Sequence, residues 1–153
     1  MVEVKFIPAE GQVDFTNIRY CPVINCVLQY QNKILLVQRS SEMRLYPNYW
    51  NGISGFLDDD KSVAEKVLHE LEEELGIPAD AVKELRRGQV LVQESEQYKK
   101  TWIVFPVLAT VSTDTFTLDW EAQRARWLTP EAAKELRLLP GFNEVLDTLL
   151  KTR

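Results

Sequence analysis

The segment Gly55–Ile77, with the sequence GFLDDDKSVAEKVLHELEEELGI, joins a glycine-led acidic loop to an amphipathic stretch. Asp60 and Ser62 are both suited to cap the start of a helix, and Gly76 followed by Pro78 is typical of a helix end. Apolar residues recur between these signals at helical spacing: Ala64, Leu68, Leu71 and Leu75. The pattern predicts a helix over residues 62–75.

Four glutamates lie in the last turns of this predicted helix. Residues three or four apart are neighbours on a helix surface, so Glu70, Glu73 and Glu74 share one side and Glu72 points elsewhere. Three like charges repel one another, and anions are disfavoured at a helix C-terminus. A divalent cation between the carboxylates would remove both penalties, because Mg²⁺ prefers carboxylate oxygens together with substrate phosphates. The alternative is a solvated acidic face without a ligand.

Strand patterns flank the helix on both sides. Residues 17–30 and Lys33–Arg39 are rich in β-branched and aromatic residues, and the turn at Gln31-Asn32 predicts that they form a hairpin. Strands are also predicted at 2–7, 50–57, 83–94, 101–112 and 124–128, a loop at 40–49, and helices starting after Thr129 and near Gly141. Strands and helices mix without βαβ regularity, so the fold class is α+β, or an α/β/α sandwich around a mixed β-sheet.

The composition excludes several classes of site. The chain has 153 residues, a length typical of one domain, and its net charge of −5 argues against general binding to a nucleic-acid backbone. His69 is the single histidine, so zinc sites built from several imidazoles are excluded. The odd spacing of Cys21 and Cys26 within a strand favours free thiols over a mutual disulfide. No signal-like or membrane-spanning apolar run occurs, which predicts a cytoplasmic protein with no membrane partner.

The segment Gly55–Ile77 resembles the Nudix box, G-x5-E-x7-R-E-U-x-E-E-x-G-U, in which U is aliphatic. Seven of the nine defined positions match with the correct spacing: Gly55, Glu70, Leu71, Glu73, Glu74, Gly76 and Ile77. Lys61 stands at the position of the first glutamate, and His69 stands at the position of the arginine. The preceding hairpin, the Trp50-Asn51-Gly52 approach and the late ARWLTPEAAKEL segment also fit, so the resemblance covers nearly the whole chain.

The resemblance implies a Nudix-type α/β/α sandwich over residues 1–153 as one domain, with residues 1–15 as an N-terminal extension. It implies Mg²⁺-dependent hydrolysis of the diphosphate linkage of a nucleoside diphosphate derivative, with Mn²⁺ as the alternative cation. Nucleotide sugars and ADP-ribose rank ahead of nucleoside triphosphates, and dinucleotides are also open.

In this interpretation the box residues have defined roles. The carboxylates of Glu70, Glu73 and Glu74 hold the metal, which lowers the pKa of an attacking water. The backbone of Gly55 lies close to the metal and to the helix start, where a Cβ atom would obstruct.

A further carboxylate from outside the box is common in the family. Glu94 and Glu96, between two predicted strands, are the candidates for deprotonating water or completing the metal shell, and the alternative is a polar hairpin loop. Asp119 and Glu121 lie in a later loop and rank below them.

A wall that stacks the nucleobase and binds phosphate is predicted from Arg39, Tyr46 and Trp50. For Trp50 the alternative is a place in the hydrophobic core.

The two departures from the box concern support of the site. His69 cannot form the bidentate contacts of an arginine, but it lies four residues from Glu73 and is expected to orient a neighbouring glutamate; a direct catalytic role is the alternative. Lys61 is expected at the solvated surface or paired with a nearby acid: Asp58, Asp59 or Glu65. An active enzyme with intact metal ligands and weakened support is the prediction.

Three other functions are left open by the sequence. Lys61 and His69 motivate a catalytically weak or inactive Nudix domain that acts as a nucleotide-binding or regulatory module. An isoprenoid diphosphate isomerase resembles the chain less, because that chemistry uses several histidines and a catalytic cysteine. A generic α+β interaction domain is the third. The expected partner is a small nucleotide and no nucleic acid, with a homodimer suggested by analogy with relatives.

Overall fold

A computed structural model describes residues 7–150 of the chain. The strand expected at residues 2–7 therefore lies, except for its last residue, outside the described part. The elements in chain order are β1 (Tyr20–Tyr30), β2 (Lys33–Arg39), β3 (Trp50–Asn51), β4 (Ile53–Phe56), α1 (Val63–Leu75), the 3₁₀ turn η1 (Ala79–Ala81), β5 (Val82–Arg87), β6 (Leu91–Ser95), β7 (Lys100–Val111), β8 (Ala122–Leu128), α2 (Pro130–Ala133) and α3 (Phe142–Leu150).

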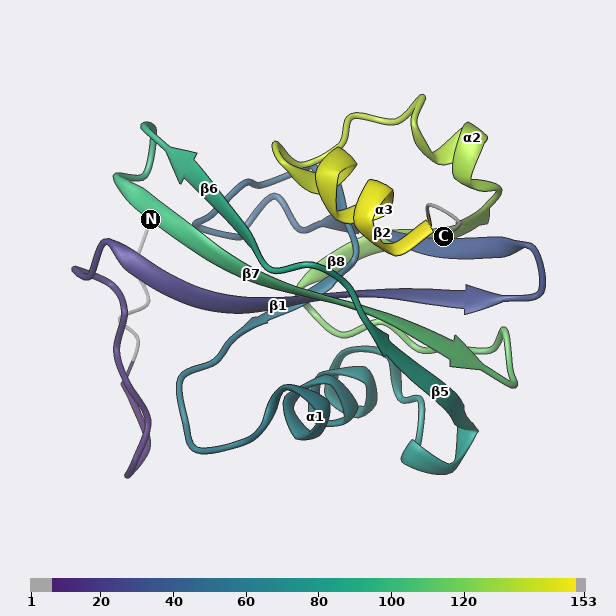
Figure 1. Ribbon diagram of the computed structural model, residues 1–153, viewed down its shortest axis with the longest axis horizontal. Coiled ribbons are helices and arrows are strands. Elements are labelled where there is room, and N and C mark those ends of the chain that lie inside the picture. The colour runs from purple at the N-terminus through teal and green to yellow at the C-terminus, as the bar shows by residue number, and fades with distance from the viewer. Residues whose placement is uncertain (1–6, 151–153) are drawn as a thin grey trace.

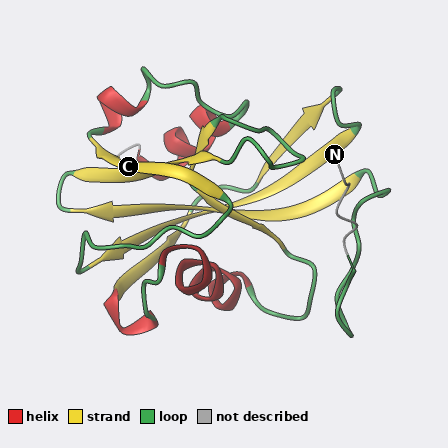
Figure 2. Ribbon diagram, turned by 180° about the vertical axis from the view of Figure 1, so that it is seen from behind, coloured by secondary structure: helices red, strands yellow, loops and turns green. Residues whose placement is uncertain are grey.

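One mixed sheet organises the molecule. Its strand order is β3-β2-β1-β7-β5, with β4 paired to β1, β6 to β7 and β8 to β2. The long central strands β1 and β7 are parallel, and the other pairs are antiparallel. Helix α1 covers one face of the sheet, and α2 and α3 cover the other (Figures 1 and 2). The predicted α/β/α sandwich is confirmed, as are the β1–β2 hairpin and the loop at 40–49.

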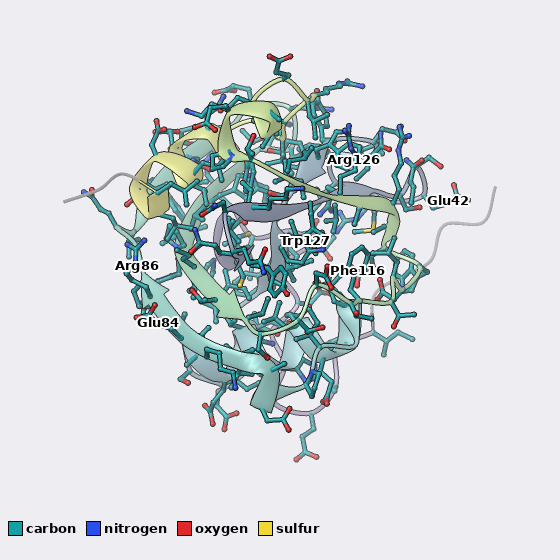
Figure 3. All side chains as sticks on the ribbon, turned by 90° about the vertical axis from the view of Figure 1, so that its right-hand side faces the viewer. Glu42, Glu84, Arg86, Phe116, Arg126 and Trp127 are labelled. Atoms are coloured by element: carbon teal, nitrogen blue, oxygen red, sulfur yellow. The ribbon has the colours of Figure 1, made fainter. Side chains whose placement is uncertain are left out.

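Two apolar cores lie on the two faces of the sheet. Alternate residues of β1, among them Ile24 and Cys26, pack with Leu71 of α1, whereas Val27 packs with Phe142 of α3. Phe116 and Trp127, labelled in Figure 3, pack against the α1 side. Both cysteines are buried and free, as their spacing predicted.

The predicted strand at 50–57 is two strands, which is a correction. A Cβ atom at Gly52 would lie 2.6 Å from Asn25 Oδ1 and 2.7 Å from the Cys26 carbonyl oxygen, so the backbone approaches β1 closely at this point. The chain accordingly changes partner there: β3 pairs with β2, and β4 pairs with β1.

The predicted strand at 83–94 is also two strands, β5 and β6, which pair with different halves of β7. The break faces Pro106, which has no N–H group for a continuous ladder. The Pro106 carbonyl instead accepts a hydrogen bond of 2.9 Å from the Gly88 N–H.

Helix α1 begins and ends where the sequence predicted. Ser62 is the N-cap and forms a reciprocal capping box with Glu65. Gly76 is the C-cap with φ of 66°, a conformation that glycine adopts without strain. Thr129 caps α2, which ends after a single turn, and no helix within residues 7–150 has the length and apolarity needed to cross a membrane.

Candidate active site

The end of β4 and the face of α1 approach each other closely at Gly55. A Cβ atom on Gly55 would lie 3.1 Å from both Cγ and Cδ of Glu70. A side chain at Gly55 would therefore collide with Glu70, so the glycine leaves the space that the Glu70 side chain occupies.

The outer part of the acidic face is exposed. His69 Nε2 lies 2.8 Å from Glu73 Oε2, with 46% and 57% of the two side chains accessible to solvent. His69, Glu70 and Glu73 each offer one possible metal-ligand atom, and these three atoms lie within 4.8 Å of one another. The expectation that His69 orients a neighbouring glutamate agrees with this contact.

The inner part of the acidic face is half-buried. Glu74 Oε2 is inaccessible to water, and no donor reaches that atom among the described residues. Burial, followed by a side-chain hydrogen bond with Glu70 and by the charge of Glu121, raises the pKa of Glu74 to about 11. Glu70 thus joins the exposed His69 and Glu73 to the half-buried Glu74.

Two acids from outside the box, Glu121 and Asp119, raise the pKa of Glu74, although the sequence ranked both below Glu94 and Glu96. The β2–β8 ladder pairs Arg39 with Ala122, and the Glu121 carbonyl accepts a hydrogen bond of 2.8 Å from the Ser40 N–H. Burial, then the charges of Asp119 and Glu70, raise the pKa of Glu121 to about 7. Its position at the start of β8 was not visible in the sequence, because nothing local indicates that β8 pairs with β2.

Arg39 is a half-buried cation whose charge interacts with the inner carboxylates. Burial lowers the pKa of its guanidinium, and the charges of Glu121 and Glu74 oppose that effect. Its Nε donates to the Leu45 carbonyl at 3.0 Å, which fixes the side chain beside the loop at 40–49. The predicted phosphate-binding residue therefore lies next to the acidic cluster.

Glu94 and Glu96 lie elsewhere, on β6 and the turn that follows it. Glu94 Oε1 accepts a hydrogen bond of 2.7 Å from Thr101 Oγ1 and lies 3.8 Å from Arg19. Neither residue is among the groups that shift the pKa of Glu74 or Glu121. Both line a cavity that also contains Tyr46.

The predicted aromatic wall divides into two parts. Tyr46 is buried but still lines the cavity, and its hydroxyl accepts a hydrogen bond of 3.1 Å from Trp102 Nε1. Trp50 is only 5% exposed and packs in the core beneath α3. The stacking role for Trp50 is therefore wrong, and the core alternative is correct, because its ring has neighbours in the protein rather than an open face.

A second acidic cluster lies before the same helix and is fully paired. Lys66, which is 5% exposed, contacts Asp58 at 3.1 Å and Asp59 at 3.0 Å, and Lys61 contacts Asp59 at 3.1 Å. Burial raises the pKa of Asp59, but the hydrogen bonds from Lys61 and Lys66 outweigh it and lower the pKa to about 2. The pair predicted for Lys61 is present, whereas the buried Lys66 was not anticipated.

The carboxylates on this face of α1 suit a hard divalent cation. Glu70 and Glu73 offer oxygens within 4.8 Å of each other, Glu74 lies beside Glu70, and Mg²⁺ and Mn²⁺ both accept such ligands. The unpartnered buried Glu74 Oε2 is the observation that tests this fit, because a buried acid without a donor is costly unless a proton or a cation compensates it.

Comparisons by family model, by sequence and by structure all match this chain to the same family of proteins. The NUDIX domain family matches residues 19–149. A Nudix hydrolase of Bacillus subtilis, YvcI, is 25% identical over 129 residues, covering 84% of this chain and 78% of that protein. The CTP pyrophosphohydrolase of Escherichia coli is 26% identical over 131 residues, covering 86% and 92%. The NUDIX domain of Shewanella oneidensis NrtR, solved with ADP ribose, superposes with a TM-score of 0.70 at 18% identity, covering 84% of each chain.

Proposed function

The chain belongs to the NUDIX family, and on this premise we propose that it hydrolyses the diphosphate linkage of nucleoside diphosphate derivatives with a bound divalent cation. The observation that carries the proposal is the buried Glu74 Oε2, which has no partner among the described residues. Glu70 and Glu121 lie close enough to raise the pKa of Glu74 further. Acidic groups held together in this way create a strong local preference for a cation.

The ligands in this proposal are Glu70, Glu73 and Glu74. When bound, Mg²⁺ or Mn²⁺ neutralises diphosphate charge and lowers the pKa of the attacking water. Gly55 keeps the space in which Glu70 is positioned. His69 restrains Glu73 through their 2.8 Å contact, but a single hydrogen bond replaces the two that an arginine would give.

Arg39 and Glu121 supply the remaining chemistry from β2 and β8. The guanidinium of Arg39 is suited to bind an oxygen of the diphosphate and to stabilise the charge that develops on it. With its pKa raised to about 7, Glu121 is suited to take a proton from water near neutral pH. It is therefore a stronger candidate for the general base than Glu94 or Glu96.

The nucleotide class of substrate is supported by two relatives. One is named for CTP and another was solved with ADP ribose, and both ligands carry a nucleoside joined to a phosphoanhydride. Nucleotide sugars, ADP-ribose, nucleoside triphosphates and dinucleotides all present that linkage and are the panel to test.

The experiment is a hydrolysis screen over that panel with Mg²⁺, with Mn²⁺ and with a chelator. We expect turnover that requires the cation and is abolished by Glu73→Gln, while Glu72→Gln, on another side of α1, retains it. Hydrolysis that persists in the chelator, or in Glu73→Gln, would contradict the proposal. Nucleotide binding without hydrolysis across the panel would favour the regulatory module motivated by Lys61 and His69.

A further inference from the structure

A cavity of about 390 Å³ lies between β6, the turn after it, the start of α3 and Tyr46. This volume is within the roughly 300–1,000 Å³ range of small-molecule sites. Tyr46 and Trp102 form its aromatic part, with ring centroids 6.4 Å apart and a hydrogen bond between Trp102 Nε1 and the Tyr46 hydroxyl. The two rings are tilted by 53° and Tyr46 is 8% exposed, so the half-buried Trp102 offers the larger apolar contact to a ligand.

The cavity adjoins the acidic cluster through two sets of contacts. The Leu45 carbonyl, adjacent to Tyr46 in the chain, accepts a hydrogen bond from Arg39, which reaches toward Glu121. The Trp102 ring lies 6.0 Å from the ring of Phe56, and Phe56 directly follows Gly55. These contacts connect the cavity wall to Arg39 and to the strand that carries Gly55, both part of the proposed diphosphate site.

The polar lining of the cavity accepts hydrogen bonds more than it donates them. Three carboxylates line it, those of Glu94, Glu96 and Glu144, and none of the described lining residues is basic. Gln93 Nε2 donates to the Gly141 carbonyl at 2.9 Å and to Glu144 Oε1 at 3.1 Å. These two bonds occupy the amide hydrogens of Gln93, so its Oε1 is left as an additional acceptor.

Acceptor-rich walls discriminate between nucleobases. Cytosine carries a donor amino group at the position where uracil carries an acceptor oxygen, and adenine and guanine also carry exocyclic amino groups. An acceptor facing a carbonyl oxygen gives no hydrogen bond and places two negative partial charges together, whereas an amino group donates to the same acceptor. The three carboxylates would also repel a phosphate, so this cavity suits the base rather than the diphosphate.

We propose that this cavity holds the nucleobase of the substrate and selects amino-bearing bases, with cytosine preferred over uracil. The proposal rests on the proposed function for the position of the diphosphate. Glu96 has no side-chain partner among the described residues and Gln93 is fixed by its two bonds, so these two residues are the expected acceptors.

The test measures binding of CMP and of UMP to the metal-free chain by calorimetry, so that it does not depend on turnover. We expect CMP to bind about tenfold more tightly than UMP, the size of one good base contact. Glu96→Gln and Gln93→Met should each reduce this ratio to about threefold or less. Glu84→Gln is the matched control and should leave the ratio unchanged, because Glu84 lies on β5 (labelled in Figure 3) and does not line the cavity.

Equal binding of CMP and UMP to the unaltered chain would overturn the inference, as would a ratio that both variants leave unchanged. If CTP and UTP are hydrolysed with a cation but CMP and UMP bind equally, the proposed function stands and the cavity assignment fails. If CMP is preferred and the variants remove that preference, but nothing is hydrolysed, the cavity assignment stands and the proposed function fails.

Discussion

Helix α1 carries an acidic cluster at each end, and the two are neutralised in different ways. Before its first turn, Asp58 and Asp59 meet the buried Lys66, and hydrogen bonds from Lys61 and Lys66 lower the pKa of Asp59 to about 2. In its last turns, Glu70 and Glu74 meet further carboxylates, and the pKa of Glu74 rises instead. The first cluster is a completed structural ion-pair network, whereas the second has more carboxylates than Arg39 alone can neutralise and is suited to a divalent cation.

Glu74→Gln is expected to have the largest effect on activity, and it tests the second cluster. We expect the rate of metal-dependent hydrolysis to fall about 1,000-fold, because a positioned ligand and its transition-state electrostatics are lost. The unfolding free energy of the metal-free chain should hardly change, because glutamine resembles the protonated carboxyl that the raised pKa implies. Steady-state kinetics and urea unfolding check the two parts. A variant with unaltered turnover would remove Glu74 from the ligand set.

Lys66→Met tests the first cluster and should lower the free energy of unfolding. Removing one partner from a buried pair leaves uncompensated charge and destabilises by about 3–5 kcal/mol. Urea unfolding measures the loss, and Lys61→Met is the control, since an exposed pair contributes only about 0–1 kcal/mol. If Lys66→Met unfolds at the same urea concentration as the unaltered chain, the first cluster is not the structural pair described.

Glu121→Gln tests the carboxylate that joins the second cluster from β8. We expect kcat to fall about 100-fold, within the usual contribution of a general base. Glu94→Gln, at the cavity and bonded to Thr101, is expected to change kcat only slightly. If kcat falls more in Glu94→Gln than in Glu121→Gln, the general base is Glu94 on β6 and not Glu121.

His69→Arg is expected to have the smallest effect. The exposed contact between His69 and Glu73 gives weaker support than an arginine fork, and loss of such support commonly costs about 10–100-fold. Introducing the arginine that the family pattern has at this position should raise kcat/KM about tenfold, as measured by phosphate release after coupling to a phosphatase. An unchanged rate would show that His69 already supports Glu73 fully.

Local signals predicted the parts of the site that lie on one element. The helix, its caps and the shared side of Glu70, Glu73 and Glu74 follow from a periodic pattern bounded by Ser62 and Gly76. These features depend on residues within a few positions of one another. The sequence was therefore sufficient for the box helix.

The parts that depend on distant strand pairing were not accessible in the same way. Glu121 is brought to the cluster by the pairing of β8 with β2. The splitting of the strand at 83–94 depends on Pro106 in a strand that follows it. A single sequence contains no local indication of these pairings.

The most direct test of the comparison is calorimetric titration of Mn²⁺ and Mg²⁺ into the metal-free chain. Because the raised pKa keeps Glu74 protonated near neutral pH, a cation must displace its proton, so binding should release protons and tighten as the pH rises. We predict this behaviour for the unaltered chain and for Glu72→Gln, and at least about tenfold weaker binding for Glu74→Gln. Absence of cation binding, or equal binding by Glu74→Gln, would contradict the assignment of the second cluster as a cation site.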